Sequence, residues 1–132
     1  MDWYSRFVVA WRLPTTLAVD FVIKAAKEAL TIGVPDITNS DKGVQYTSED
    51  YLSLWDQEKT RISMDGRGRA MDNIFTERLW RSVKYDEVYL KDYQTVSDAK
   101  EGIGTYLKDY NYGRLRQSLG YKTSAEIYFE RR

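Results

Sequence analysis

The sequence contains no cysteine and no histidine among its 132 residues. Without cysteine there is neither a disulfide framework nor a thiolate metal site. Without histidine, Ser-His-Asp triads, Cys-His pairs and histidine-ligated zinc are excluded as well. Any acid–base or metal chemistry must therefore use carboxylates, lysine, tyrosine or bound water.

Long hydrophobic runs are also missing. No apolar segment approaches the roughly 20 residues that span a bilayer, and the opening "MDWYSRF" has neither the basic nor the apolar region of a signal peptide. A hydrophobic content of 42% and a charged content of 30% are ordinary for a globular domain. We therefore expect a cytoplasmic protein of one domain, with no membrane segment.

The formal net charge is zero, which argues weakly against a general nucleic-acid binder. The charge is unevenly distributed, however: residues 1–60 carry a net charge of −3, residues 61–84 carry +3, and residues 85–132 carry 0. The basic side chains of the middle segment are Arg61, Arg67, Arg69, Arg78, Arg81 and Lys84. This excess is either a solvated helix face or a surface for phosphates, and charge alone leaves both interpretations open.

The order of predicted elements indicates an α/β fold. The apolar run "RFVVAWRL" at 6–13 predicts a strand because it is rich in β-branched and aromatic residues. A helix follows to about Leu30, with Gly33 as a stop signal. "DITNSD" predicts a short strand that ends at Asp41, and "TRISM" predicts another at 60–64.

Capping signals predict the remaining helices. Thr47, with an acid three residues later, predicts a helix that ends near Lys59. Thr95 predicts the start of another helix, and a last short helix is expected near Ser124. Between them, Asp72 or Asn73 is expected to cap a helix whose apolar stripe is Phe75, Leu79, Trp80 and Val83.

Two acids stand out against this background. Asp41 ends a predicted strand in "NSDKGVQY", and Glu77 lies about one turn into a predicted helix in "MDNIFTERLW", with 35 residues between them. A carboxylate at the end of a strand lies at the rim of an α/β sheet, where sites form. Two hard oxygen donors suit Mg²⁺ or Mn²⁺. Spacing alone leaves open that Asp41 is a turn residue and Glu77 a surface acid.

The sequence motifs around these acids narrow the choice between a metal site and two surface residues. "NSDKGVQYTS", "MDGRGRAMDNIFTERLWRSVKYDEVY" and "DYNYGRLRQSLGYKTSAEIY" occur in this order, after "DWYSRFVVAW" at the start. Together they resemble the integrase-type catalytic core of bacterial insertion-sequence transposases, relatives of retroviral integrases in the DDE group. The resemblance implies a ribonuclease H-like fold and metal-dependent DNA strand transfer. It also implies that Asp41 and Glu77 are the second and third catalytic acids and ligands of two Mg²⁺ or Mn²⁺ ions.

The same resemblance implies a set of DNA contacts. Basic side chains near the acids would meet DNA phosphates, Asn73 would help to position the DNA, and an aromatic and basic cluster in the tail is a further candidate. The residues expected to bind DNA are Lys42, Arg67, Arg69, Asn73, Arg78, Arg81, Lys84, Arg114 and Arg116.

Three departures from the family pattern are visible. The first catalytic acid, expected in a "TDIT"-like motif on a strand before "DWYSR", has no match, and Asp2 corresponds to a family position outside the catalytic three. Arg116 replaces the histidine of "HQSL", and Ser124 replaces a proline. We therefore expect a core that lacks its first two strands, with residues 1–90 as the partial core and 91–132 as its C-terminal helical segment.

The missing acid and strands have expected consequences. The chain alone should be inactive, because the first acid bridges both metal ions. Without the two missing strands, the predicted strand at 6–13 and the predicted strand that ends at Asp41 share no hydrogen-bonding neighbour. Unpaired apolar strands favour self-association, or association with a full-length transposase. The alternatives are a non-catalytic remnant that binds DNA or joins transposase subunits, and a decayed reading frame.

Overall fold

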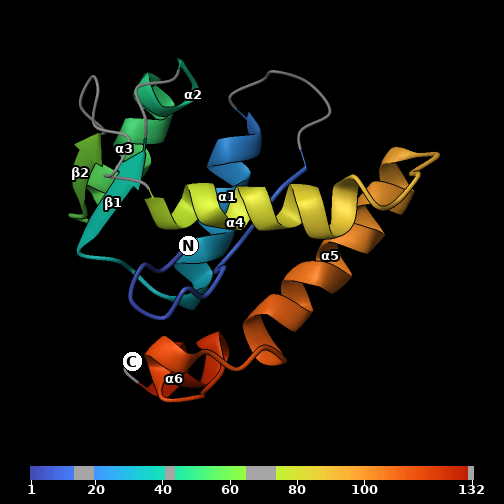
Figure 1. Cartoon of the computed structure of the whole chain (residues 1–132). Coiled ribbons are helices and arrows are strands. Elements are labelled where there is room, and N and C mark those ends of the chain that lie inside the picture. The colour runs from blue at the N-terminus through green and yellow to red at the C-terminus, as the bar shows by residue number, and fades with distance from the viewer. Residues whose placement is uncertain (14–19, 41–43, 65–73, 131–132) are drawn as a thin grey trace. The chain divides into compact units, whose positions relative to one another are not determined.

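The computed structural model describes residues 1–13, 20–40, 44–64 and 74–130, and they form two compact units (Figure 1). Unit 1 consists of Met1–Val9 and Phe75–Arg132, and unit 2 of Ala10–Ile74. In the described ranges, no helix has both the length and the apolar character needed to cross a membrane. The division of the core between residues 90 and 91 stays a prediction.

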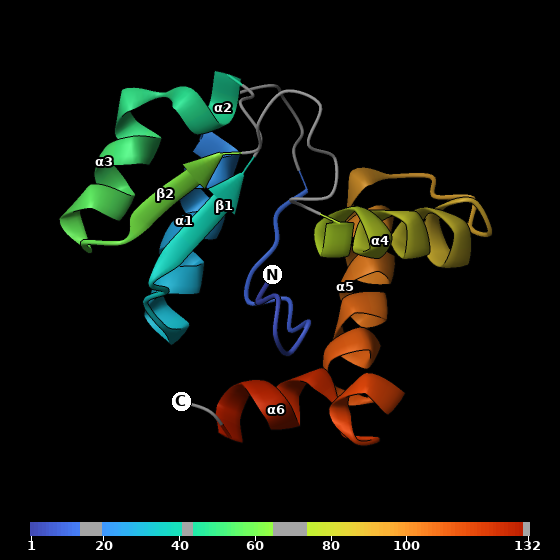
Figure 2. The same cartoon turned by 60° about the vertical axis from the view of Figure 1, so that its left-hand side comes forward.

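Unit 2 contains a parallel pair of strands (Figure 2). Strand β1 (Ile37–Ser40) pairs with β2 (Arg61–Met64), with Ile37 opposite Arg61 and Ser40 opposite Met64. The Thr60 hydroxyl, just before β2, donates to the Pro35 carbonyl at 2.9 Å and so ties the starts of the two strands together. Both short strands are confirmed, and the chain mixes helices with a parallel two-stranded sheet.

Two helices pack together beside this sheet (Figure 2). They are α1 (Asp20–Ile32) and α3 (Glu49–Gln57), and α2 (Val44–Thr47) precedes α3. The shared core is formed by Val22 and Ala26 of α1 with Tyr51 and Trp55 of α3. Each pair is spaced by four residues, so each helix presents one apolar stripe to the other. Burial also raises the pKa of the Tyr51 phenol.

The start of α3 differs from the prediction by one residue. Ser48, not Thr47, is the cap, and its hydroxyl accepts a hydrogen bond from the Tyr51 amide at 3.4 Å. Thr47 is instead the last residue of α2, so its backbone is already helical. An N-cap needs a non-helical backbone, which Ser48 has.

The C-terminal part of unit 1 is mainly helical. It contains α4 (Ile74–Val83), the π-helix η2 (Lys84–Val88), α5 (Val96–Tyr112), the 3-10 helix η3 (Gln117–Leu119) and α6 (Ser124–Glu130). The predicted cap of α5 is confirmed: the Thr95 hydroxyl accepts from the Asp98 amide at 3.0 Å. The buried face of α5 consists of Ile103, Leu107, Tyr110 and Asn111.

The apolar stripe of α4 is narrower than predicted. Leu79 and Val83 are buried, but Trp80 is 52% exposed. The buried positions continue every four residues to Glu87 in η2. Trp80 is one residue away from this row, about 100° around the helix, and therefore lies outside it.

The predicted strand at 6–13 is wrong: these residues form no strand. Arg6 has a backbone φ of 65°, which interrupts an extended run. The amide and carbonyl of Val8 bond to the Asn111 side chain, at 2.9 and 3.0 Å, in place of a neighbouring strand. Phe7 stacks on Tyr128 with ring centroids 4.7 Å apart. Phe7 and Val8 are thus buried against the helices of unit 1.

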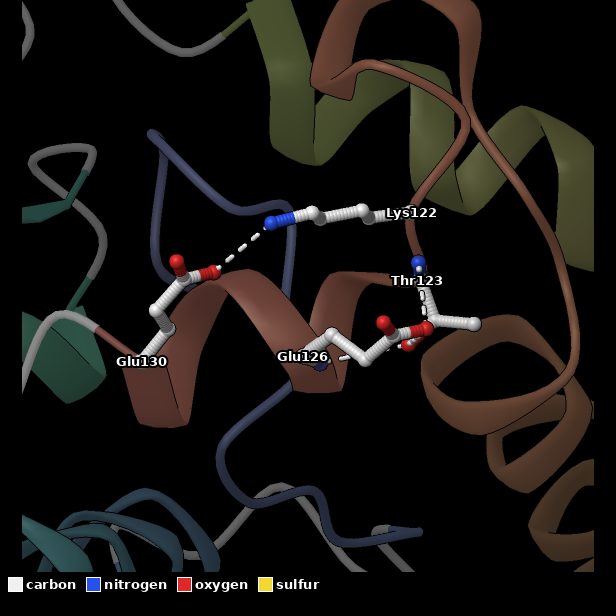
Figure 3. A network of polar contacts seen from close by, with 4 residues as sticks. All are labelled: Lys122, Thr123, Glu126 and Glu130. Carbon is white, nitrogen blue, oxygen red and sulfur yellow. Dashed lines mark hydrogen bonds and ion pairs between the residues drawn. The ribbon is translucent and has the colours of Figure 1, made fainter.

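A reciprocal cap begins α6, as Figure 3 shows. The Thr123 hydroxyl accepts from the Glu126 amide at 3.2 Å, and Glu126 Oε1 accepts from the Thr123 amide at 3.3 Å. This capping box satisfies two amides that would otherwise lack helical partners. Beside it, Lys122 Nζ lies 3.2 Å from Glu130 Oε2 in an exposed ion pair.

We expect Thr123→Ala to destabilise unit 1 by about 1 kcal/mol, because the hydroxyl acceptor at the helix start is lost. Lys122→Ala is the matched control, because an exposed ion pair contributes at most about 1 kcal/mol and often nothing measurable. Urea unfolding followed by circular dichroism measures both variants. Equal stability of Thr123→Ala and the parent chain would show that the box has no stabilising effect.

Candidate nucleic-acid and metal site

The two expected metal ligands fall in different units. Glu77 lies in the first turn of α4 and is exposed. Its carboxylate forms no hydrogen bond or ion pair with any residue in the described ranges. Asp41 belongs to unit 2 and lies outside the described residues. Within the described part of the chain, no group of three or more carboxylates is placed to hold a metal ion. The fit of the pair to a metal therefore stays a prediction.

The basic residues near Glu77 are exposed on one continuous helical segment. Arg78 and Arg81 lie on α4, and Lys84 begins η2. The Arg81 guanidinium carbon lies 5.2 Å from the centre of the Tyr85 ring, a cation–π distance. The other expected DNA contacts before α4, Lys42, Arg67, Arg69 and Asn73, lie outside the described residues.

The tail arginines gather on Tyr110 of α5. The guanidinium carbon of Arg116 lies 4.2 Å from the Tyr110 ring centre, and that of Arg114 lies 5.5 Å from it. Burial raises the pKa of the Tyr110 phenol, while the neighbouring arginines act in the opposite direction. The predicted aromatic and basic cluster is thus brought together within unit 1.

The basic side chains of α4, η2 and the tail form what we call the basic surface of unit 1. Arg6 belongs to it as well, although the sequence motifs did not point to this residue. Its guanidinium carbon lies 3.6 Å from the centre of the Phe75 ring in α4. Its Nη1 donates to the carbonyl oxygens of Trp3 and Tyr4, the latter at 3.2 Å. The available signal was a single arginine at the start of an apolar run, and a predicted strand gave it no role.

Comparison with known proteins supplies the family. Residues 58–123 match the family model described as an integrase core domain. The chain belongs to this integrase core family. The resemblance predicted from the sequence is thereby confirmed, and the matched segment contains Glu77, Arg78, Arg81, Lys84, Arg114 and Arg116.

Relatives of the chain are described as transposases of insertion sequences. The transposase for element IS904 of Lactococcus lactis is 30% identical over 133 residues, which cover 96% of this chain and 52% of that protein. The transposase for IS629 of Shigella sonnei is 27% identical, over 96% of this chain and 43% of its own length. The putative transposase InsK for IS150 of Escherichia coli is 24% identical, over 90% and 43%. The chain spans about half the length of the curated relatives it matches.

Two residues predicted to depart from the family pattern contact each other. Arg116 donates from Nε to the hydroxyl of Ser124 at 3.0 Å. Ser124 is fully buried. A proline at position 124 would have no hydroxyl to accept this bond.

Unit 1 also contains a buried carboxylate. Glu87 in η2 is 8% exposed, and its Oε2 accepts a hydrogen bond from the Tyr93 hydroxyl. Burial and the adjacent carboxylate raise the pKa of Tyr93 to about 12. An open pocket of about 300 Å³ adjoins this pair and is lined by Glu87, Lys91, Asp98, Glu101, Gly102 and Thr105.

The Tyr93 phenol predicts a defined alkaline response. The folded chain holds this proton more tightly than an unfolded phenol with a pKa of 10.0, so its contribution to stability is complete below pH 10 and is lost as the pH rises to about 12. Tyr93→Phe lacks this titration, and the difference in urea midpoint between the two proteins should shrink across that interval. A difference that stays constant with pH would contradict the shift.

Proposed function

We propose that the chain is part of a transposase that cleaves and joins DNA, and that it contributes Asp41 and Glu77 to a divalent-metal site on a ribonuclease H-like core. The observation that carries the proposal is the match of residues 58–123 to the integrase core, because this segment includes Glu77. The relatives support it, since they are named as transposases.

The local structure is compatible with such a site. Strands β1 and β2 run parallel, so their C-terminal ends lie at one edge of the sheet, and Asp41 directly follows the last residue of β1 in the sequence. Active sites of α/β sheets form at this edge. Glu77 is exposed and free of ion pairs with described residues, so its carboxylate oxygens are available. Both acids offer the hard oxygen donors that Mg²⁺ and Mn²⁺ prefer.

Metal ions held there would activate water or a 3′-hydroxyl and stabilise the leaving oxygen of a phosphodiester. The role of this chain is to orient those ions and to hold the DNA. A third carboxylate, which the resemblance places on a strand before "DWYSR", would complete the ligand set. We therefore propose that the chain alone is inactive, that it acts on DNA in the cytoplasm, and that it associates with itself or with a longer transposase.

The DNA contacts follow from charge and exposure. Arg78, Arg81 and Lys84 lie along α4 and η2 beside Glu77, where they would meet phosphates near the reacting bond. Arg114 and Arg116 extend the basic surface of unit 1. Lys42, Arg67, Arg69 and Asn73 are proposed as further contacts.

The test uses two proteins. The first is the chain itself, and the second is a chimera that places before it the preceding part of the Lactococcus lactis transposase. We expect the chain to bind a fluorescein-labelled duplex with salt-sensitive affinity, and the chimera to nick supercoiled plasmid with Mg²⁺ or Mn²⁺. DNA binding by both without nicking favours the alternative, a non-catalytic module that binds DNA. No DNA binding by either contradicts both functions.

A further inference from the structure

Three arginines of unit 1 lie on two aromatic rings, Arg6 and Arg78 on Phe75 and Arg116 on Tyr110. Arg6 and Arg78 approach the same Phe75 ring, with guanidinium carbons 3.6 and 6.0 Å from its centre. Burial lowers the pKa of Arg6, and the positive charges of Arg116 and Arg78 lower it further, while Tyr110 and Asp2 act in the opposite direction. Three cations held this close cost free energy unless an anion accompanies them.

The described residues do not supply that anion. The ion pairs of the described part of the chain join Arg12 with Glu28 and Lys122 with Glu130, and none includes these three arginines. Two acids lie near these arginines. Asp2 Oδ2 accepts from both the amide and the hydroxyl of Ser5, so its charge is directed to a turn. Glu77 precedes Arg78 on α4 and forms no ion pair with it. Two acids against three arginines leave a positive excess.

The guanidinium of Arg116 also lacks a hydrogen-bond acceptor. Its Nε is bonded to Ser124, but its Nη2 is buried and has no hydrogen-bond partner among the described residues. A buried donor without an acceptor costs about 1–3 kcal/mol, and more when it is charged. A phosphate oxygen is an acceptor of the kind this nitrogen lacks.

The backbone at Arg6 is the third observation. A φ of 65° is unusual for a residue other than glycine, and costs of order 1–3 kcal/mol persist where the surroundings or a function require the conformation. The turn directs the guanidinium onto Phe75 and uses only Nη1 for its own carbonyl contacts. The Nε and Nη2 of Arg6 have no hydrogen-bond acceptor among the described residues, so a ligand could use them.

We propose that Arg6, Arg78 and Arg116 form a phosphate-binding site that holds one phosphate group of the DNA backbone, an inference that rests on the proposed function. Planar guanidinium groups bind phosphate oxygens through paired N–H donors, and the aromatic rings of Phe75 and Tyr110 fix the planes of the guanidiniums. Arg78 follows Glu77 on α4, so the phosphate-binding site and the proposed metal ligand share this helix.

The salt dependence of DNA binding tests this site. Each phosphate contact contributes about 0.9 to the slope of log K against log salt concentration. Arg6→Gln should lower this slope by about that amount and weaken binding equally for duplexes of different sequence. Arg78→Gln changes an exposed helix position and should lower the slope in the same way. It replaces Arg6→Gln in the test if circular dichroism shows that Arg6→Gln does not fold.

Lys100→Gln is the control, since it removes one exposed positive charge from α5 about 15 Å along the helix from Tyr110. The site is supported if the two arginine variants lower the slope and the control does not. If DNA binds and all three variants behave as the parent chain, or all three lower the slope alike, the inference is wrong.

A second measurement separates this inference from the proposed function. Inorganic phosphate is titrated into the chain while the arginine Nε–H resonances are followed by NMR. Saturable shifts at Arg6, Arg78 and Arg116 that disappear in Arg78→Gln support the site even if the chain binds no DNA, in which case the proposed function fails and the ligand is free phosphate. No saturable shift, together with no DNA binding, overturns both.

Discussion

Asn111→Ala is expected to lower the free energy of unfolding of unit 1 by about 2–5 kcal/mol, because two buried backbone groups lose their partners at roughly 1–3 kcal/mol each. The Asn111 side chain accepts from the Val8 amide at 2.9 Å and donates to the Val8 carbonyl at 3.0 Å. Asn111 and Val8 are each 7% exposed, so water cannot replace the lost bonds. The loss is comparable to the whole stability of many small domains.

The measurement combines urea unfolding with hydrogen exchange at the Val8 amide. Asn111→Ala should accelerate exchange at that amide more than exchange in the middle of α5. The reason is that the two Asn111–Val8 hydrogen bonds, called the clamp below, hold residues 1–9. Lys108→Ala, an exposed substitution on the same helix, is the control and should change stability by no more than about 0.5 kcal/mol. If Asn111→Ala is as stable as this control, the clamp has no energetic role.

This clamp explains why the sequence predicted a strand that the structure lacks. The run at 6–13 has strand composition, but a strand exists only when another strand satisfies its backbone groups. The partner of Val8 is a side chain 103 residues away, and no local pattern announces it. Elements whose signals lie within one turn, such as the Thr95 cap of α5, were predicted correctly.

Small errors have the same origin. Ser48 and Thr47 can both cap a helix, and the end of α2 decides between them. Trp80 is large and apolar, but the buried row runs through Leu79 and Val83. A helix boundary decides the first case and packing decides the second, and composition alone gives neither.

The candidate site was predicted unevenly. The helical pattern predicted Glu77 about one turn into a helix, and the structure has it in the first turn of α4. The contacts of Arg116 with Tyr110 and Ser124 depend on how η3 and α6 return to α5, and spacing alone does not give this. Arg6 was missed because its role depends on a turn and on Phe75, 69 residues later in the sequence.

The largest effect on activity is expected from Glu77→Gln in the chimera. The substitution keeps the size of the side chain but removes the charge that a divalent ion requires of its ligand. Residues that merely support metal ligands cost about 10–100-fold when changed, so loss of a ligand should reduce strand joining on the order of 100-fold or more. Asp41→Asn should behave alike, and the double variant should be no worse than either single one, because both acids are proposed to bind the same ions.

The same variant separates catalysis from folding. Glu77 is exposed, so its replacement should leave the urea midpoint within the range of surface substitutions, about 0.5 kcal/mol. DNA affinity in EDTA should stay unchanged, whereas Mn²⁺ binding, followed by the loss of the free-ion electron paramagnetic resonance signal, should weaken. Glu101→Gln, an equal change of charge at an exposed position of α5, is the control and should retain full joining activity. Joining by Glu77→Gln within a few-fold of the parent chimera would remove Glu77 from the metal site and leave DNA binding as the function of this chain.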